Sequence, residues 1–181
     1  MGSASAGDEL SKRIAKAVLE RLQADPRRGW SVLAQGLAGA VARHLAGRDV
    51  AVRFVGALPP EHRAADGSPR NGITYREGER AVILLDPSGL SPVKLLGLYL
   101  HEVAHARLHA GCFQDSLKPV AVADLPNGSL ADRIVKAAQQ KREAQADELA
   151  GRWAAYAEQV APGGSVADRL EALLSWKPEA Q

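Results

Sequence analysis

The chain has little of what marks extracellular, membrane or nucleic-acid-binding proteins. Its 181 residues include one cysteine, Cys112, which excludes an intrachain disulfide and a zinc site made of four thiolates. The formal net charge is only +2, far from the clustered basic surface typical of nucleic-acid binding. With neither a disulfide framework nor a signal peptide, the sequence favours a cytoplasmic protein without a nucleic-acid partner.

Long hydrophobic runs and nucleotide-binding motifs are also absent. A membrane-spanning helix needs about 20 consecutive apolar residues, whereas the longest candidate, near Val93–Leu100, is interrupted by Lys94 and Gly97. The chain contains no phosphate-binding loop, no GxGxxG after a strand and no GxSxG. What is present is a hydrophobic content of 46%, enough for one domain with a sizeable core.

Hydrophobic periodicity predicts a single α+β domain over residues 8–181, after a flexible leader over residues 1–7. Alternation of apolar residues in 49–56 indicates a half-buried strand. Residues 73–85 are typical of a hairpin whose second strand is apolar on both faces and therefore an inner strand. In chain order we expect extra N-terminal helices (8–48), a small mixed or antiparallel sheet with a following helix (49–110), and a helical C-terminal part (129–176).

The helix expected after the sheet carries the main functional motif, in the stretch YLHEVAHARLHAG. Ser91 and Pro92 are typical of its first turn. His101 and His105 are four residues apart, so they share one helix face and can present two imidazoles to one ion. Glu102 is rotated by about 100° and can reach a water on that ion without binding it. This is the HExxH pattern of metallopeptidases, in which the glutamate is the general base.

His109 continues the four-residue spacing but is not expected to be a ligand. It lies eight residues beyond His101, which is about 12 Å along a straight helix. Three histidines spread over that length cannot all reach one ion through bonds of about 2.1 Å. We therefore expect His109 to support the site, to face a substrate, or to cap the helix end.

The third ligand is expected on the helix predicted from residue 129 onward. Glu143 and Asp147 are four residues apart and share a face there. If Glu143 is the ligand, Asp147 is placed to accept the second N–H of a ligand imidazole and fix its tautomer. Glu148 is the rival and is expected to face solvent. Small side chains would allow the two helices to pack closely; they are Ala144, Ala146 and Ala150.

Two segments together resemble the ImmA/IrrE family of zincin-like metallopeptidases. They are AVILLDPSGLSPVKLLGLYLHEVAHARLH and EAQADELAGRWA, and the resemblance covers about residues 70–157. It implies a minimal zincin-like core that holds Zn²⁺ through His101, His105 and Glu143, with Glu102 as base. Members commonly cleave helix-turn-helix repressors, so a protein or peptide substrate is implied, with a repressor as one candidate. Gln145 departs from the family pattern, where a second acidic residue usually stands.

The residues leave several points open. The group that stabilises the oxyanion or contacts substrate has four candidates, of which His109 and Tyr156 are the first two and Tyr99 and Arg133 the others. Strand 73–76 is a candidate edge for pairing with an extended substrate. The alternative to an endopeptidase is a non-hydrolytic binding module of zincin fold that sequesters a regulator protein or single-stranded DNA. Two imidazoles and a carboxylate also accept Mn²⁺, Co²⁺ or Fe²⁺.

Overall fold

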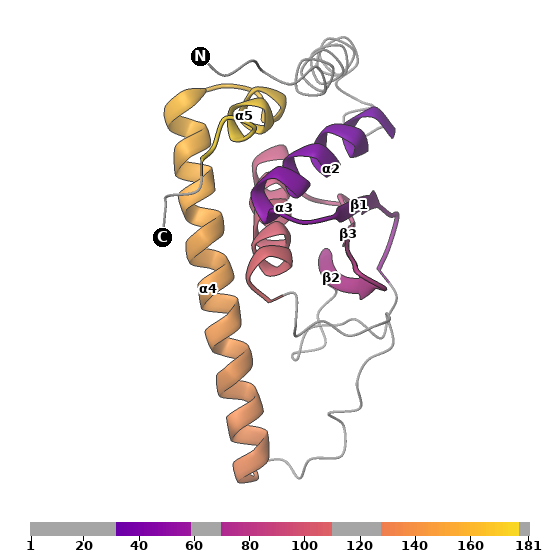
Figure 1. Cartoon of the computed structure of the whole chain (residues 1–181), viewed down its shortest axis with the longest axis vertical. Coiled ribbons are helices and arrows are strands. Elements are labelled where there is room, and N and C mark those ends of the chain that lie inside the picture. The colour runs from indigo at the N-terminus through magenta and orange to yellow at the C-terminus, as the bar shows by residue number, and fades with distance from the viewer. Residues whose placement is uncertain (1–31, 59–69, 110–127, 178–181) are drawn as a thin grey trace.

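The computed structural model describes residues 32–58, 70–109 and 128–177 of the chain (Figure 1). The part described is α+β, with four helices and a small mixed sheet of three strands, as expected. The expected leader, the part of the expected N-terminal helices that precedes residue 32, and Cys112 lie outside the described residues. The elements are α2 (Val32–Ala46), β1 (Val50–Phe54), β2 (Gly72–Glu77), β3 (Arg80–Leu85), α3 (Pro92–Leu108), α4 (Leu130–Val160) and α5 (Val166–Leu173).

The sheet has β3 in the middle, in the order β1-β3-β2, which confirms the inner strand expected from its apolar run. β1 runs parallel to β3, with Val50 opposite Ala81, and β2 runs antiparallel, with Gly72 opposite Leu85. The hairpin between β2 and β3 turns at Gly78, whose φ of 60° suits a tight two-residue turn and needs a residue without Cβ. Among the described strands, β2 is therefore an edge strand beside α3.

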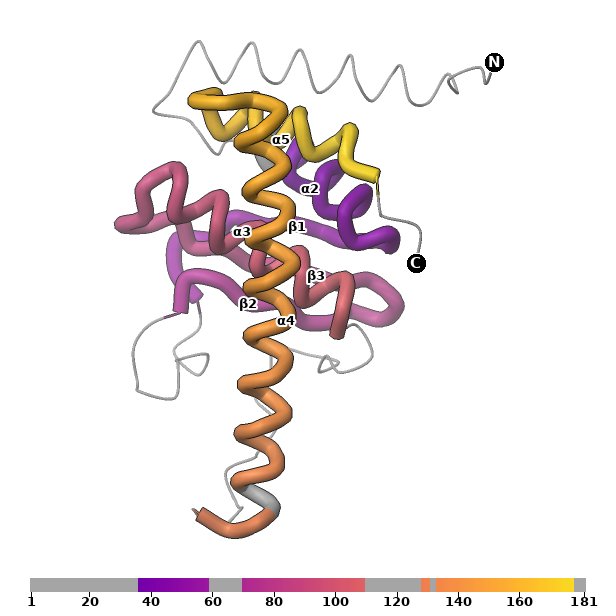
Figure 2. The backbone as a smooth tube through the Cα atoms, turned by 90° about the vertical axis from the view of Figure 1, so that its left-hand side faces the viewer, coloured from indigo at the N-terminus to yellow at the C-terminus, as the bar shows by residue number. Residues whose placement is uncertain are grey.

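The helices form two further layers on one side of the sheet (Figures 1 and 2). Helices α2 and α3 pack against the strands, and α4 packs against α3 on the side away from the sheet. Helix α5 returns to contact both α4 and α2. The first turns of α4 extend beyond the other described elements, and only its second half reaches the core, anchored by the fully buried Trp153.

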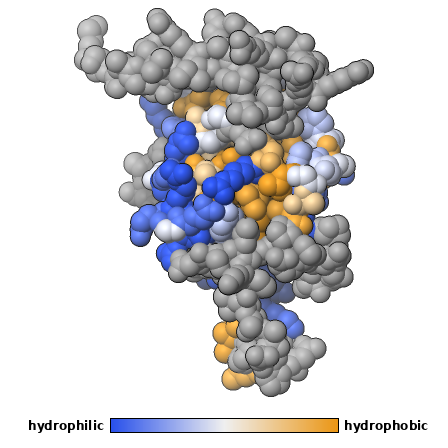
Figure 3. Space-filling view, turned by 90° about the vertical axis from the view of Figure 1, so that its right-hand side faces the viewer, coloured by the Kyte–Doolittle hydropathy of each residue, from blue (hydrophilic) through white to orange (hydrophobic). Residues whose placement is uncertain are grey.

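The core lies mainly between the sheet and the helices, but both faces of β3 are covered. Ile83 and Leu85 pack with the helices, whereas Val82 and Leu84 form a smaller cluster with Tyr75 on the opposite face. Figure 3 views the strand side of the molecule, where a hydrophobic patch lies beside a hydrophilic area. The continuous apolar run of β3 thus reflects burial from two sides.

Helix ends follow the sequence closely. The Ser91 hydroxyl accepts a hydrogen bond from the backbone N–H of Lys94, and Pro92 occupies the first turn of α3, as predicted. Helix α4 begins directly after Ser129, also as predicted. No helix in residues 32–58, 70–109 or 128–177 is long and apolar enough to cross a membrane.

Candidate metal centre

Two imidazoles meet on one face of α3. His101 and His105 lie one turn apart, and their Nε2 atoms are 3.0 Å from each other. Both rings are partly buried, because α4 crosses the same face of α3. The helical spacing thus brings the two nitrogens together as the sequence predicts.

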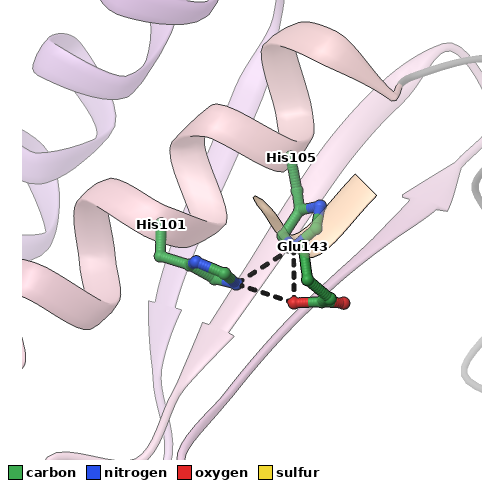
Figure 4. Close-up of side chains that lie close together, drawn as sticks. All are labelled: His101, His105 and Glu143. Carbon is green, nitrogen blue, oxygen red and sulfur yellow. Dashed lines mark hydrogen bonds and ion pairs between the residues drawn. The ribbon is translucent and has the colours of Figure 1, made fainter. Parts of the chain in front are cut away.

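Glu143 joins the two histidines from α4. Its Oε2 lies 3.2 Å from Nε2 of His101 and 3.4 Å from Nε2 of His105 (Figure 4). These three residues form the group that could hold a metal ion in the part of the chain described. Close packing of α4 on α3 relies on two of the three small residues expected there, since Ala146 and Ala150 are buried and Ala144 is exposed.

The spacing of the three atoms fits a tetrahedral ion. Ligand bonds of about 2.0–2.1 Å at tetrahedral angles place neighbouring ligand atoms about 3.3 Å apart. The observed separations are 3.0, 3.2 and 3.4 Å. Two imidazoles and one carboxylate leave a fourth position for water or substrate, which is the donor set of catalytic rather than structural zinc sites.

Asp147 fixes the ring of His101. Its Oδ1 lies 2.7 Å from Nδ1 of His101, so this nitrogen donates to Asp147, and Nε2 is the nitrogen left to offer a lone pair once a metal ion displaces its proton. The contact is the one predicted from the four-residue spacing of Glu143 and Asp147. Without metal, the hydrogen bond to Glu143 raises the pKa of His101 to about 9, helped by the charges of Glu102 and Asp147 and opposed by burial. The same contacts with His101 and His105 lower the pKa of Glu143.

His109 contacts His105 rather than the metal position. Its Nδ1 lies 3.0 Å from Nδ1 of His105, the nitrogen that points away from Glu143. Its Nε2 lies 3.3 Å from Oε1 of Gln145 on α4. Burial lowers the pKa of His109 and favours the neutral ring. The structure thus places His109 in a supporting position and at the C-cap of α3, which are two of the three roles expected for it.

Glu102 is buried between α3 and β2, with only 6% of its surface exposed. The Thr74 hydroxyl lies 2.6 Å from its Oε2 and donates a hydrogen bond to it. Gly72 lies against the other oxygen, since a Cβ there would be 2.8 Å from Oε1. Burial raises the pKa of Glu102, and the Thr74 hydrogen bond opposes this rise. A carboxylate with a raised pKa is a stronger base, which suits proton transfer near neutral pH.

Three of the other predicted residues are not brought to the site. Tyr156 lies 13 residues after Glu143, about 20 Å along α4, and its hydroxyl bonds to Oγ of Ser175. Tyr99 is fully buried, and its hydroxyl donates to the carbonyl of Ala38. Arg133 is exposed on the first turns of α4. The rival ligand Glu148 is exposed, as expected.

Sequence reasoning did not identify Thr74 and Gly72 as neighbours of Glu102. Their contacts join residues in different elements, 28 positions apart in the case of Thr74. The feature of the sequence that points to Thr74 is its place in strand 73–76, the candidate edge strand. Gln145 departs from the family pattern in the sequence, but its contact with His109 depends on the packing of α4 against α3.

The chain was compared with known proteins. Searches against protein-family models, curated proteins and solved structures find no match to this chain.

Proposed function

We propose that the chain is a zinc-dependent metallo-endopeptidase that hydrolyses a peptide bond in a protein partner. The observation that carries the proposal is the convergence of three ligand atoms from α3 and α4 at separations of 3.0–3.4 Å. Glu102, which follows His101 in α3, is buried. The resemblance to zincin-like ImmA/IrrE metallopeptidases supports the same reading. It makes a helix-turn-helix repressor one candidate substrate.

His101, His105 and Glu143 would hold the metal. A zinc ion bound there supplies Lewis-acid chemistry, lowering the pKa of a water to about 7 and polarising the scissile carbonyl. The chain's own contribution includes orienting His101 through Asp147. Because an open ligand position remains, the site suits hydrolysis better than a structural staple.

Glu102 would be the proton carrier of the reaction. Its carboxylate accepts a proton from the attacking water and delivers it to the leaving amine. Thr74 holds one carboxylate oxygen through its hydrogen bond, so the carboxylate has a fixed orientation. Burial keeps competing water away from the base.

Replacing Glu102 tests the proposal. Glu102→Gln keeps the shape and removes the base, so we expect zinc content and fold to be retained and cleavage to fall about 10²- to 10⁴-fold. Zinc-loaded protein is incubated with reduced, alkylated casein and a mixed peptide library, and new amino termini are counted by mass spectrometry. Glu148→Gln, the same change at an exposed position of α4, is the control.

Equal cleavage by wild type and Glu102→Gln would contradict a role as base. Full biological activity of Glu102→Gln in cells would favour the non-hydrolytic binding module instead.

A further inference from the structure

Nδ1 of His105, which points away from the metal position, lies at one end of a row of hydrogen-bonded side chains formed with His109 and Gln145. Nδ1 of His105 is 3.0 Å from Nδ1 of His109, and Nε2 of His109 is 3.3 Å from Oε1 of Gln145. His109 is 8% exposed, so its ring is screened from solvent that would otherwise compete for these bonds. These hydrogen bonds link α3, which carries His105 and His109, to α4, which carries Gln145 and Glu143.

Only one arrangement of protons lets His105 act as a ligand here. The amide oxygen of Gln145 is an acceptor, so Nε2 of His109 donates and its Nδ1 accepts. Nδ1 of His105 then donates to Nδ1 of His109, which leaves Nε2 of His105 with a free lone pair toward Glu143. The reverse arrangement would place a proton on Nε2 of His105 and prevent metal binding.

We propose that His109 is a positioning residue that, with Gln145, holds the ring and tautomer of His105 for metal binding. The inference rests on the metal site proposed above. It assigns the two ligand histidines different supports: the exposed carboxylate of Asp147 for His101, and the buried ring of His109 with the exposed amide of Gln145 for His105. Partners of this kind change metal affinity by about 10- to 100-fold when they are removed.

His109 also ends helix α3, and this capping role can be separated from its proposed positioning of His105. The backbone N–H of His109 bonds to the carbonyl of His105 at 2.9 Å and caps α3. Any residue with a backbone N–H keeps that bond, whereas the contact to Nδ1 of His105 needs a side-chain acceptor. Substitutions of the side chain therefore distinguish positioning from capping.

The test is zinc affinity of the full chain, measured by competition with a chromophoric chelator. His109→Phe fills the space without an acceptor and is expected to weaken binding about 10- to 100-fold. His109→Gln restores an acceptor and is expected to bind close to wild type. Gln145→Met removes the outer acceptor and is expected to give a smaller loss than His109→Phe, with Gln139→Met at another exposed position of α4 as its control.

The outcomes separate this inference from the proposed function. Absence of zinc binding by wild type would defeat the metal site itself. Zinc binding by wild type with equal affinity in His109→Phe, or an equal loss in His109→Phe and His109→Gln, would overturn only the positioning role. Thermal melting of the zinc-free variants checks folding. If His109→Phe does not fold, equal affinities of Gln145→Met and Gln139→Met overturn the role.

Discussion

At the scale of single residues, the most constrained group is the carboxylate of Glu102. A buried carboxylate is costly unless it is hydrogen-bonded, and Thr74 provides the side-chain hydrogen bond observed in the described part of the chain. The hydroxyl of Thr74 also lies 3.1 Å from the Glu102 carbonyl, so one residue of β2 contacts both ends of Glu102. The side chain of Thr74 thus joins Glu102, the proposed base, to the edge strand β2.

Thr74→Val should therefore destabilise the protein although its shape is kept. Leaving a buried polar group without its partner costs about 1–3 kcal/mol, and each kcal/mol lowers the melting temperature by about 2–4 °C in a chain of this size. The cost should be smaller in a Glu102→Gln background, because a neutral amide is less costly to leave unpaired. Melting of the four proteins of this double-mutant cycle measures it, and equal costs in both backgrounds would contradict the pairing.

The raised pKa of His101 makes zinc binding depend on pH. With a pKa of about 9 in the metal-free protein, Nε2 of His101 is protonated at neutral pH, and zinc must displace that proton. Affinity should therefore rise with pH up to about 9 and level off above it. Calorimetry at pH 7 in buffers of different ionisation enthalpy should show about one proton released from His101 per zinc. Binding without proton release would show that His101 is not the ligand or is not protonated.

At the scale of elements, β2 and α3 approach closely at Gly72. A Cβ at this position would be 2.8 Å from Oε1 of Glu102 and 2.9 Å from Cδ1 of Leu98. A Cβ at Gly97, an exposed glycine of α3, would meet no atom of the described residues within 4 Å apart from its chain neighbours and the backbone of its own helix. A methyl group at Gly72 would therefore displace the side chains of Glu102 and Leu98, whereas one at Gly97 would not displace a neighbouring side chain of the described residues.

Gly72→Ala should displace the Glu102 carboxylate while the metal ligands stay in place. A misplacement of about 1 Å lowers activity about 10²-fold, so cleavage should fall and zinc content should remain. Gly97→Ala should keep cleavage and raise the free energy of unfolding by about 0.5–1 kcal/mol, because alanine is the better helix former. Peptide cleavage and thermal melting measure both variants. Full cleavage activity in Gly72→Ala would show that the close approach is unimportant.

The parts predictable from the sequence are those governed by local spacing. The four-residue spacings place His101 beside His105, and Glu143 beside Asp147, once each segment is helical. The apolar run of β3 indicates an inner strand, and Ser91 with Pro92 marks the start of α3. Each of these features depends on residues that are close together in the sequence.

The contacts that the sequence left undetermined join distant segments. The parallel pairing of β1 with β3 and the Thr74–Glu102 bond depend on tertiary packing, which residue spacing does not encode. Tyr156 shares α4 with Glu143, but the length of that helix carries it toward α5 and its hydroxyl to Ser175. Spacing therefore identifies the candidate ligands better than it identifies the groups around them.

At the scale of the whole molecule, the candidate site joins two parts of the chain that are far apart in sequence. Helix α3 follows the sheet, whereas α4 begins at Leu130 and extends well beyond the other described elements (Figure 2). Trp153 anchors the second half of α4 in the core, and Glu143 lies ahead of it at the level of the two histidines. A metal ion held there would cross-link the two helices and stabilise the folded state over the unfolded one.

The most direct test is the zinc content of the Glu143→Ala variant after purification and dialysis, measured by inductively coupled plasma mass spectrometry. We expect about one zinc per chain in wild type and in the exposed-residue control Glu148→Ala, and almost none in Glu143→Ala, because two imidazoles alone do not complete the three-ligand set. Stoichiometric zinc in Glu143→Ala would contradict the site built from His101, His105 and Glu143.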